Sequence, residues 1–428
     1  MFDQNGLSLD QAPPIAVVLR FFMIGALFGI FGGAFMIWNG ASVLDPATDS
    51  GRIMTHILTL GVMLAFMLGA LFQMLPVIAG VALQAPLRLA TAVQVPFVLG
   101  VVALLWGFGT HTRWAFDLAA LLLGGALLPL IILLIGKLLR LTNHSASSRG
   151  MSVALVSLGI VVVLGLYLSG TYGGVFEGKF FSQIRISHYT FGLFGWVAFL
   201  IIAISFQVVE MFYVTPPHPD WMRRGLGGAL FALLLLAALV QFWFPTIWNV
   251  TNPTIGLLLL IYALVTLRRF SQRKRPLTDA TVWFWRIGLG SLIATVFLLL
   301  LAPFGIAAPW LHTLSSLLFA AFALSILFAM LYKIIPFLTW FHLNAQGYLT
   351  APMMHEVIHP KTAKKHLYIH ATTFAILLAS IPLPLLTRVA GMGLIVSFGW
   401  LLYQVRHADT LYRHTQRTGQ RFEMPTPQ

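Results

Sequence analysis

Residues 54–77, MTHILTLGVMLAFMLGALFQMLPV, form an almost unbroken apolar stretch with a histidine near its start and a glutamine near its end. Neither His56 nor Gln73 helps the stretch to enter a membrane, because polar side chains are costly in hydrocarbon. The stretch is nevertheless long enough to cross a bilayer, which takes about 20 predominantly apolar residues. We therefore expect a membrane-spanning helix whose two polar groups have a specific role.

Stretches of this length recur along the whole chain. Hydrophobic residues make up 59% of the 428 residues and charged residues 9%, whereas about 25% of a typical soluble domain is charged. Twelve spans are expected, at 15–40, 53–80, 87–107, 114–138, 150–170, 186–213, 223–245, 252–269, 281–302, 310–335, 366–386 and 388–405. The sequence predicts an all-α integral membrane protein with a single domain over residues 1–428.

The formal net charge of +14 follows from the expected topology. With the N-terminus in the cytoplasm, the outer side holds five of the 26 Lys and Arg residues: Arg52, Arg113, Lys179, Arg185 and Arg388. The other 21 fall on the inner side, which agrees with the positive-inside rule. We expect both termini to be cytoplasmic, the protein to lie in a bacterial inner (cytoplasmic) membrane, and no nucleic acid to bind.

The pattern of residues 54–77 recurs every fourth span. The sixth span carries His188 and reaches Phe206-Gln207, and the tenth carries His312 and reaches Phe328-Ala329, where the amide is lost. Odd spans run outward in the expected topology, so all three histidines should lie near the outer surface. The sequence therefore predicts three pseudo-symmetric groups of four helices.

The longest polar stretch after the tenth span belongs to residues 336–365, for which we expect a hairpin on the cytoplasmic surface. It contains His355-Glu356-Val357-Ile358-His359, which fits the zinc-binding pattern H-E-x-x-H. The pattern needs a helix, but Pro360 directly follows His359 and disfavours helical geometry there. We interpret the match as fortuitous.

The chain has no cysteine, so thiolate ligands and disulfides are excluded. Any metal must be bound by His, Met, carboxylate or backbone oxygen. Two arrangements of the outer histidines are open. His56 and His312 could bind a heme iron from opposite sides, or His56, His188 and His312 could converge on one zinc or copper ion.

Three further polar side chains are expected toward the inner ends of the spans. Gln73 and Gln207 are interpreted as helix–helix contacts. Glu210 is interpreted either as a carboxylate that relays protons or as the partner of Lys333 or Arg223 in an ion pair.

Twelve spans in three groups of four, with histidines at the outer ends of spans two, six and ten, resemble the catalytic subunit (subunit I) of the heme–copper oxidase superfamily and its NnrS-like relatives. The resemblance implies that His56 and His312 bind a low-spin heme b, that His188 is a copper ligand, and that Arg388 contacts the heme propionates. It further implies a quinol or cytochrome as electron donor.

The chain departs from that family at the oxygen-reducing centre. His188 is followed by Tyr189-Thr190-Phe191 instead of the family's Pro-Glu-hydrophobic-Tyr motif, there is no histidine pair near the seventh span, and the tenth span has one histidine where an oxidase has two. A full terminal oxidase is therefore not expected.

Two functions are expected instead. The first is a heme-binding relative of the oxidase that acts in electron transfer or in handling nitric oxide or another small gas. The alternative is a non-enzymatic membrane protein that binds copper, zinc or heme for metal trafficking or oxidase assembly. The sequence assigns no reaction to the chain.

Overall fold

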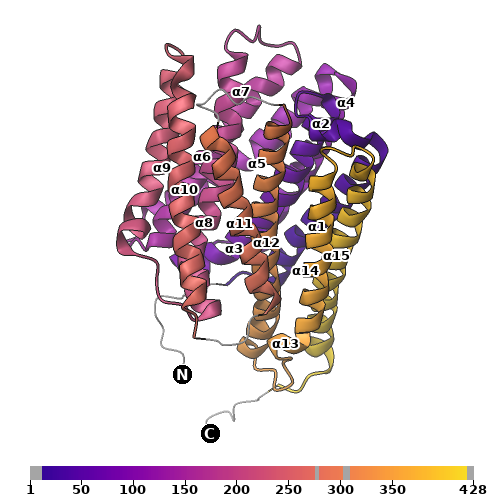
Figure 1. Cartoon of the computed structure of the whole chain (residues 1–428). Helices are drawn as coiled ribbons and strands as arrows, with labels where there is room; N and C mark the ends of the chain where they lie inside the picture. Colours follow the sequence, from indigo (N-terminus) through magenta and orange to yellow (C-terminus); the bar gives the residue numbers. More distant parts are fainter. Residues whose placement is uncertain (1–11, 275–278, 302–308, 422–428) are drawn as a thin grey trace.

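The computed structural model describes residues 12–274, 279–301 and 309–421. In chain order the α-helices are α1 (Ile15–Asn39), α2 (Asp49–His56), α3 (Ala65–Ala79), α4 (Pro86–Thr110), α5 (Arg113–Leu139), α6 (Ala146–Tyr172), α7 (Phe181–Thr190), α8 (Phe199–Tyr213), α9 (Asp220–Val240), α10 (Trp248–Ser271), α11 (Ala280–Leu301), α12 (Pro309–Ala345), α13 (Met354–Val357), α14 (Pro360–Ala379) and α15 (Leu386–Thr418). Four shorter segments are η2 (Gly40–Leu44), η3 (Ile57–Leu64), η4 (Phe191–Ala198) and η5 (Pro245–Ile247). The helices form one elongated bundle (Figure 1).

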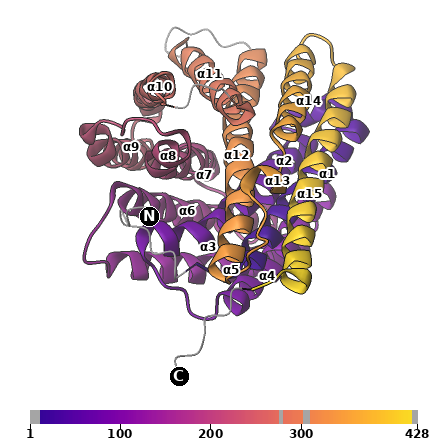
Figure 2. The same cartoon turned by 90° about the horizontal axis from the view of Figure 1, so that it is seen from below.

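Eleven helices of the described residues are long and apolar enough to cross a bilayer, so the chain is a multi-pass membrane protein. The expected span at 366–386 is the one that falls outside this set. Its place is taken by α14, a helix of 20 residues that begins and ends earlier than expected. Lysines 361, 364 and 365 lie in its first turns and lower its apolar character. Helix α14 nevertheless packs along α15, beside α11 and α12 (Figure 2).

The bundle closes on itself because its first and last long helices pack together. Helix α1 lies along α15, α5 along α6, and α10 along α11. Three spans are far more enclosed than the others: 89% of the most apolar window is buried in Asp49–Ala79, 83% in Phe181–Tyr213 and 72% in Trp310–Ala345, against at most 56% elsewhere in the described chain. These are the spans that carry His56, His188 and His312.

Two of these enclosed spans share a detailed architecture. In each, a short α-helix passes into a π-helix of eight residues, η3 or η4, and then into an α-helix of 15 residues, α3 or α8. The fifth residue of each π-helix is glycine, Gly61 or Gly195, and the ninth residue of each following helix is glutamine, Gln73 or Gln207. This agreement supports an internal repeat. Helix α12, which carries His312, is α-helical throughout and lacks this feature.

Part of the expected cytoplasmic hairpin over residues 336–365 continues the preceding span. Helix α12 extends to Ala345, and a turn leads through α13 to the start of α14 at Pro360. The residues that follow α15 return to this turn, where Arg421 forms a β-bridge with Tyr348 and its guanidinium stacks on the Tyr348 ring at 4.6 Å.

Candidate functional site

His56 is the last residue of α2, directly before the π-helix η3. The start of α2 is fixed by Thr48, whose hydroxyl accepts a hydrogen bond from the Gly51 backbone, and a Cβ at Gly51 would lie 1.8 Å from the Asp45 carbonyl oxygen. The His56 Nδ1 lies 2.8 Å from the Arg52 carbonyl oxygen. The imidazole also packs against Phe108, with ring centroids 5.1 Å apart. Its orientation is thus set from two sides.

His188 occupies the corresponding region of the second repeat, in the last turn of α7 before η4. Its Nδ1 lies 3.0 Å from the carbonyl oxygen of Val161 on α6. Gly165, one turn further along α6, makes room for the ring, because a Cβ there would lie 3.1 Å from the imidazole Cε1. His188 is close enough to His56 for the two rings to interact electrostatically. The two histidine-bearing spans therefore place their imidazoles within electrostatic range of each other.

The hydrogen bonds fix which nitrogen of each ring carries the proton. A carbonyl oxygen only accepts, so Nδ1 of His56 and of His188 must be the N–H donor. The Nε2 atoms then carry lone pairs, and no described residue donates a hydrogen bond to either of them. A histidine held through one nitrogen by a carbonyl, with the other nitrogen open, is the usual arrangement of a metal ligand. Each ring is half-buried.

A charged group lies one helical turn before His56. Asp49 forms an ion pair with Arg52 and accepts a hydrogen bond from His111 Nε2 at 2.9 Å. The Arg52 guanidinium also lies over the Tyr172 ring, 5.6 Å from its centroid. Arg52 is thereby held beside the His56 imidazole, where its charge would favour anionic groups.

The π-helices are the local feature that the two histidine-bearing spans share. A π-helix widens the turn and rotates the residues before it relative to those after it, and such segments are frequent at functional sites. Here η3 begins one residue after His56 and η4 three residues after His188. No sequence pattern indicated these π-helices, because the apolar stretch continues without interruption through each of them.

His312 and Arg388 lie apart from this pair. His312 is exposed near the start of α12, and its backbone carbonyl accepts hydrogen bonds from Ser315 and Ser316. Arg388 is exposed at the start of α15, near Gly40 at the end of α1. No contact between either residue and His56 or His188 is found in the described part of the chain, which also contains no cluster of three potential metal-binding side chains. The heme and propionate roles of these residues remain predictions.

The H-E-x-x-H match has a structural role in the described chain. Helix α13 has four residues, and the Glu356 carboxylate accepts a hydrogen bond from the Met353 backbone at 2.7 Å. His359 precedes α14 and accepts a hydrogen bond from the Lys361 backbone at 3.2 Å. Since His359 lies outside α13, the two histidines do not share a helical face as the zinc motif requires.

A buried polar chain that the sequence did not reveal lies at the other end of the bundle, between α8 and α10. His218 is 1% exposed, and its Nε2 lies 3.1 Å from the hydroxyl of Thr266. Thr266 in turn donates to the Tyr262 carbonyl, and the Tyr262 hydroxyl donates to Ser205 at 2.9 Å. Because the Thr266 proton is already used, His218 must donate from Nε2, and its Nδ1 has no partner among the described residues. His218 stands in a short loop with no periodic pattern, which hides its burial.

Glu210 faces this chain instead of forming either expected ion pair. Its carboxylate accepts a hydrogen bond from the His218 backbone and lies near the charges of Arg223 and Arg269. Lys333 pairs with Asp279, with Nζ 2.5 Å from the carboxylate oxygen. Burial alone would raise the pKa of Asp279, but the charge and hydrogen bond of Lys333 outweigh it and hold that pKa below its usual value.

His218 should make the stability of the protein depend on pH. Its burial, with the charges of Arg269 and Arg223, lowers the pKa of His218 from 6.5 to about 4. Between pH 6.5 and 4 His218 is therefore protonated in the unfolded chain but neutral in the folded chain. The free energy of unfolding falls as the pH drops through this range. The loss should reach about 3 kcal/mol at most. Thermal unfolding of the wild type and His218→Asn across this range measures it; equal slopes for both proteins would contradict the assignment.

Two more buried histidines, His366 and His370, lie on α14. His366 is hydrogen bonded to Tyr332 at 2.9 Å and to Ser397 at 2.8 Å, and His370 to Ser325 at 2.8 Å. Phe328, which the sequence aligned with Phe72 and Phe206, packs against both imidazoles. Both nitrogens of His366 are used, so this network connects α12, α14 and α15 and leaves no ring nitrogen of His366 open for a metal.

Comparison with known proteins gave no matching family model and no matching curated relative.

Proposed function

We propose that this chain is a membrane metal-binding protein in which His56 and His188 bind copper or zinc near one surface of a bundle similar to oxidase subunit I. The observation that carries the proposal is that both imidazoles are held through Nδ1 by a carbonyl oxygen with Nε2 open, and that they lie within electrostatic range of each other. Neutral imidazole suits copper and zinc. Two protein ligands leave coordination positions for exchangeable ligands, which favours a role in metal trafficking or oxidase assembly.

The proposal includes the finer architecture that the sequence predicted. We propose twelve spans in three groups of four, with α14 as the eleventh span, because the three most enclosed spans recur at every fourth position. The repeated π-helices and glutamines support this assignment for the first two groups. The third group has lost the π-helix, which agrees with an exposed His312 that takes no part in the pair.

Metal analysis of the purified protein tests this function directly. Protein purified in mild detergent should retain copper or zinc at up to one ion per chain, without a Soret band, because the ligands are imidazoles and no porphyrin is needed. Elemental analysis and an absorption spectrum of the same sample measure both. A Soret band with sharp reduced α and β bands would instead support the heme-binding relative. A sample without metal or heme after loading with either ion would contradict the proposal.

The orientation in a bacterial inner membrane is part of the same proposal. Cysteines introduced at the exposed residues Ala47 and Glu177 should react with an impermeant thiol reagent from outside, and one at Gln272 only after permeabilisation. The native chain has no cysteine, so the background should be low. The opposite labelling pattern would reverse the positions of the two ends of the bundle.

A further inference from the structure

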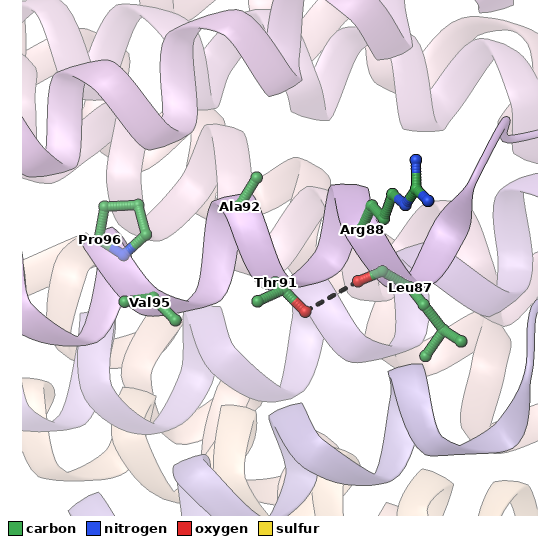
Figure 3. Close-up of a pocket in the computed structure, with 6 residues that line it drawn as sticks. All are labelled: Leu87, Arg88, Thr91, Ala92, Val95 and Pro96. Carbon is green, nitrogen blue, oxygen red and sulfur yellow. Dashed lines mark hydrogen bonds between the residues drawn. The ribbon is translucent and has the colours of Figure 1, made fainter.

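A surface hollow lies on the first turns of α4, at the end of the bundle that the charge pattern assigns to the cytoplasm. It has a volume of about 550 Å³ and is lined by Leu87, Arg88, Thr91, Ala92, Val95 and Pro96. Figure 3 shows these side chains in two rows along the helix, with the short Ala92 between Arg88 and Pro96. The lining is apolar apart from Arg88 and Thr91, so the hollow combines one charged end with a hydrocarbon-like floor.

A second guanidinium reaches this hollow from α1. Arg20 Nη1 donates a hydrogen bond to the Thr91 hydroxyl at 3.1 Å. Its Nε and Nη2 are buried and have no partner among the described residues. Arg20 stands in the second turn of a membrane-spanning helix, where an uncompensated positive charge is costly. An anion beside Arg20 would compensate this charge and accept hydrogen bonds from the two unpartnered nitrogens.

No ion pair between a carboxylate and Arg20 or Arg88 is found among the described residues. Within residues 12–145 the acidic residues are Asp45, Asp49 and Asp117, all toward the opposite end of the bundle. The end of the bundle that holds the hollow carries a further cation instead. Lys137 donates a hydrogen bond to the carbonyl of Ala82, in the loop before α4, at 2.9 Å. Helix α4 also begins without a side-chain cap, which leaves its first N–H groups open to a negative group.

We propose that this hollow binds the phosphate of an anionic phospholipid from the inner leaflet. Arg20, Arg88 and Thr91 contact the headgroup, and an acyl chain lies over Ala92, Val95 and Pro96. Basic pockets between membrane helices on the cytoplasmic side bind such headgroups. A phospholipid matches both parts of the site, because its phosphate meets the cations while its chain covers an apolar surface that water would otherwise contact. This site is independent of the proposed metal pair.

The test is a titration of the whole purified protein with phosphatidylglycerol, followed by native mass spectrometry, with phosphatidylcholine in a parallel series. Phosphatidylglycerol should bind more tightly than phosphatidylcholine. Arg88→Gln and Arg20→Met should each weaken its binding about fivefold, since one basic group near a membrane surface contributes about 1 kcal/mol. Arg224→Gln, which removes an exposed arginine from the start of α9, serves as the matched control and should bind as the wild type does.

Two results would overturn the proposal. The first is unchanged phosphatidylglycerol binding in both Arg20→Met and Arg88→Gln. The second is displacement of the lipid by millimolar inorganic phosphate, which would show that the site takes a soluble anion. Because Arg88 is exposed, Arg88→Gln should fold even if Arg20→Met does not. Lipid binding by Arg88→Gln can then still be measured and tests the proposal by itself.

Discussion

Replacing either His56 or His188 with alanine should lower the affinity for copper or zinc by more than about a hundredfold. Loss of a group that only orients a ligand already costs 10–100-fold, and each substitution here removes one of two nitrogen ligands. Both variants should fail equally, since the two Nε2 atoms have equivalent roles. Competition with a chromophoric chelator, on protein in the same detergent, measures the affinity.

Two other histidines separate this prediction from its alternatives. His111→Ala is the matched control, because His111 lies near the same end and bonds to Asp49 without belonging to the pair. It should bind metal as the wild type does. His312→Ala should also have no effect. An equal loss in His312→Ala would support the three-histidine ion site, and loss of a low-spin heme spectrum in His56→Ala and His312→Ala alone would support the bis-histidine heme.

The sequence correctly predicted an all-helical, multi-pass membrane protein, because long apolar stretches are a local pattern. Apolar length marks the eleven spans found among the described residues, whereas the sidedness expected from Lys and Arg stays a prediction. The recurrence of histidine with Phe-Gln identified the two spans that share a π-helix. It also identified the three most enclosed helices, because polar groups are retained inside a membrane chiefly where other helices cover them.

The pairing within the site could not be predicted in the same way. His56 and His188 are 132 positions apart (188 − 56), and their approach depends on Gly165 of a third helix and on π-helices that have no sequence signature. The partner of Lys333 could not be predicted for the same reason: the sequence analysis proposed Glu210. Asp279, directly before α11, is the partner in the structure, because ion pairs between helices depend on packing that single-span patterns do not encode.

Closure of the bundle depends on two glycines that bring α1 and α15 into direct backbone contact. A Cβ at Gly391 would lie 2.7 Å from the Gly33 carbonyl oxygen and 3.1 Å from the Ile37 backbone nitrogen, and a Cβ at Gly33 would lie 2.6 Å from the Gly391 carbonyl oxygen. Small residues at helix interfaces permit such close approach in membranes. Since the atoms in the way belong to the backbone, rotation of a side chain cannot relieve the overlap.

Gly391→Leu should therefore destabilise the protein by about 3 kcal/mol, the upper end of the usual cost of overpacking, because the two helices must separate along their length. The midpoint of thermal unfolding in detergent should fall by several degrees. Gly399→Leu on the same helix is the matched control, since a Cβ at Gly399 meets nothing within 4 Å. Equal stability of the two variants would mean that α1 and α15 do not close the bundle. Gly391→Ala should lie between them, because the overlap begins at the Cβ and grows with every further carbon.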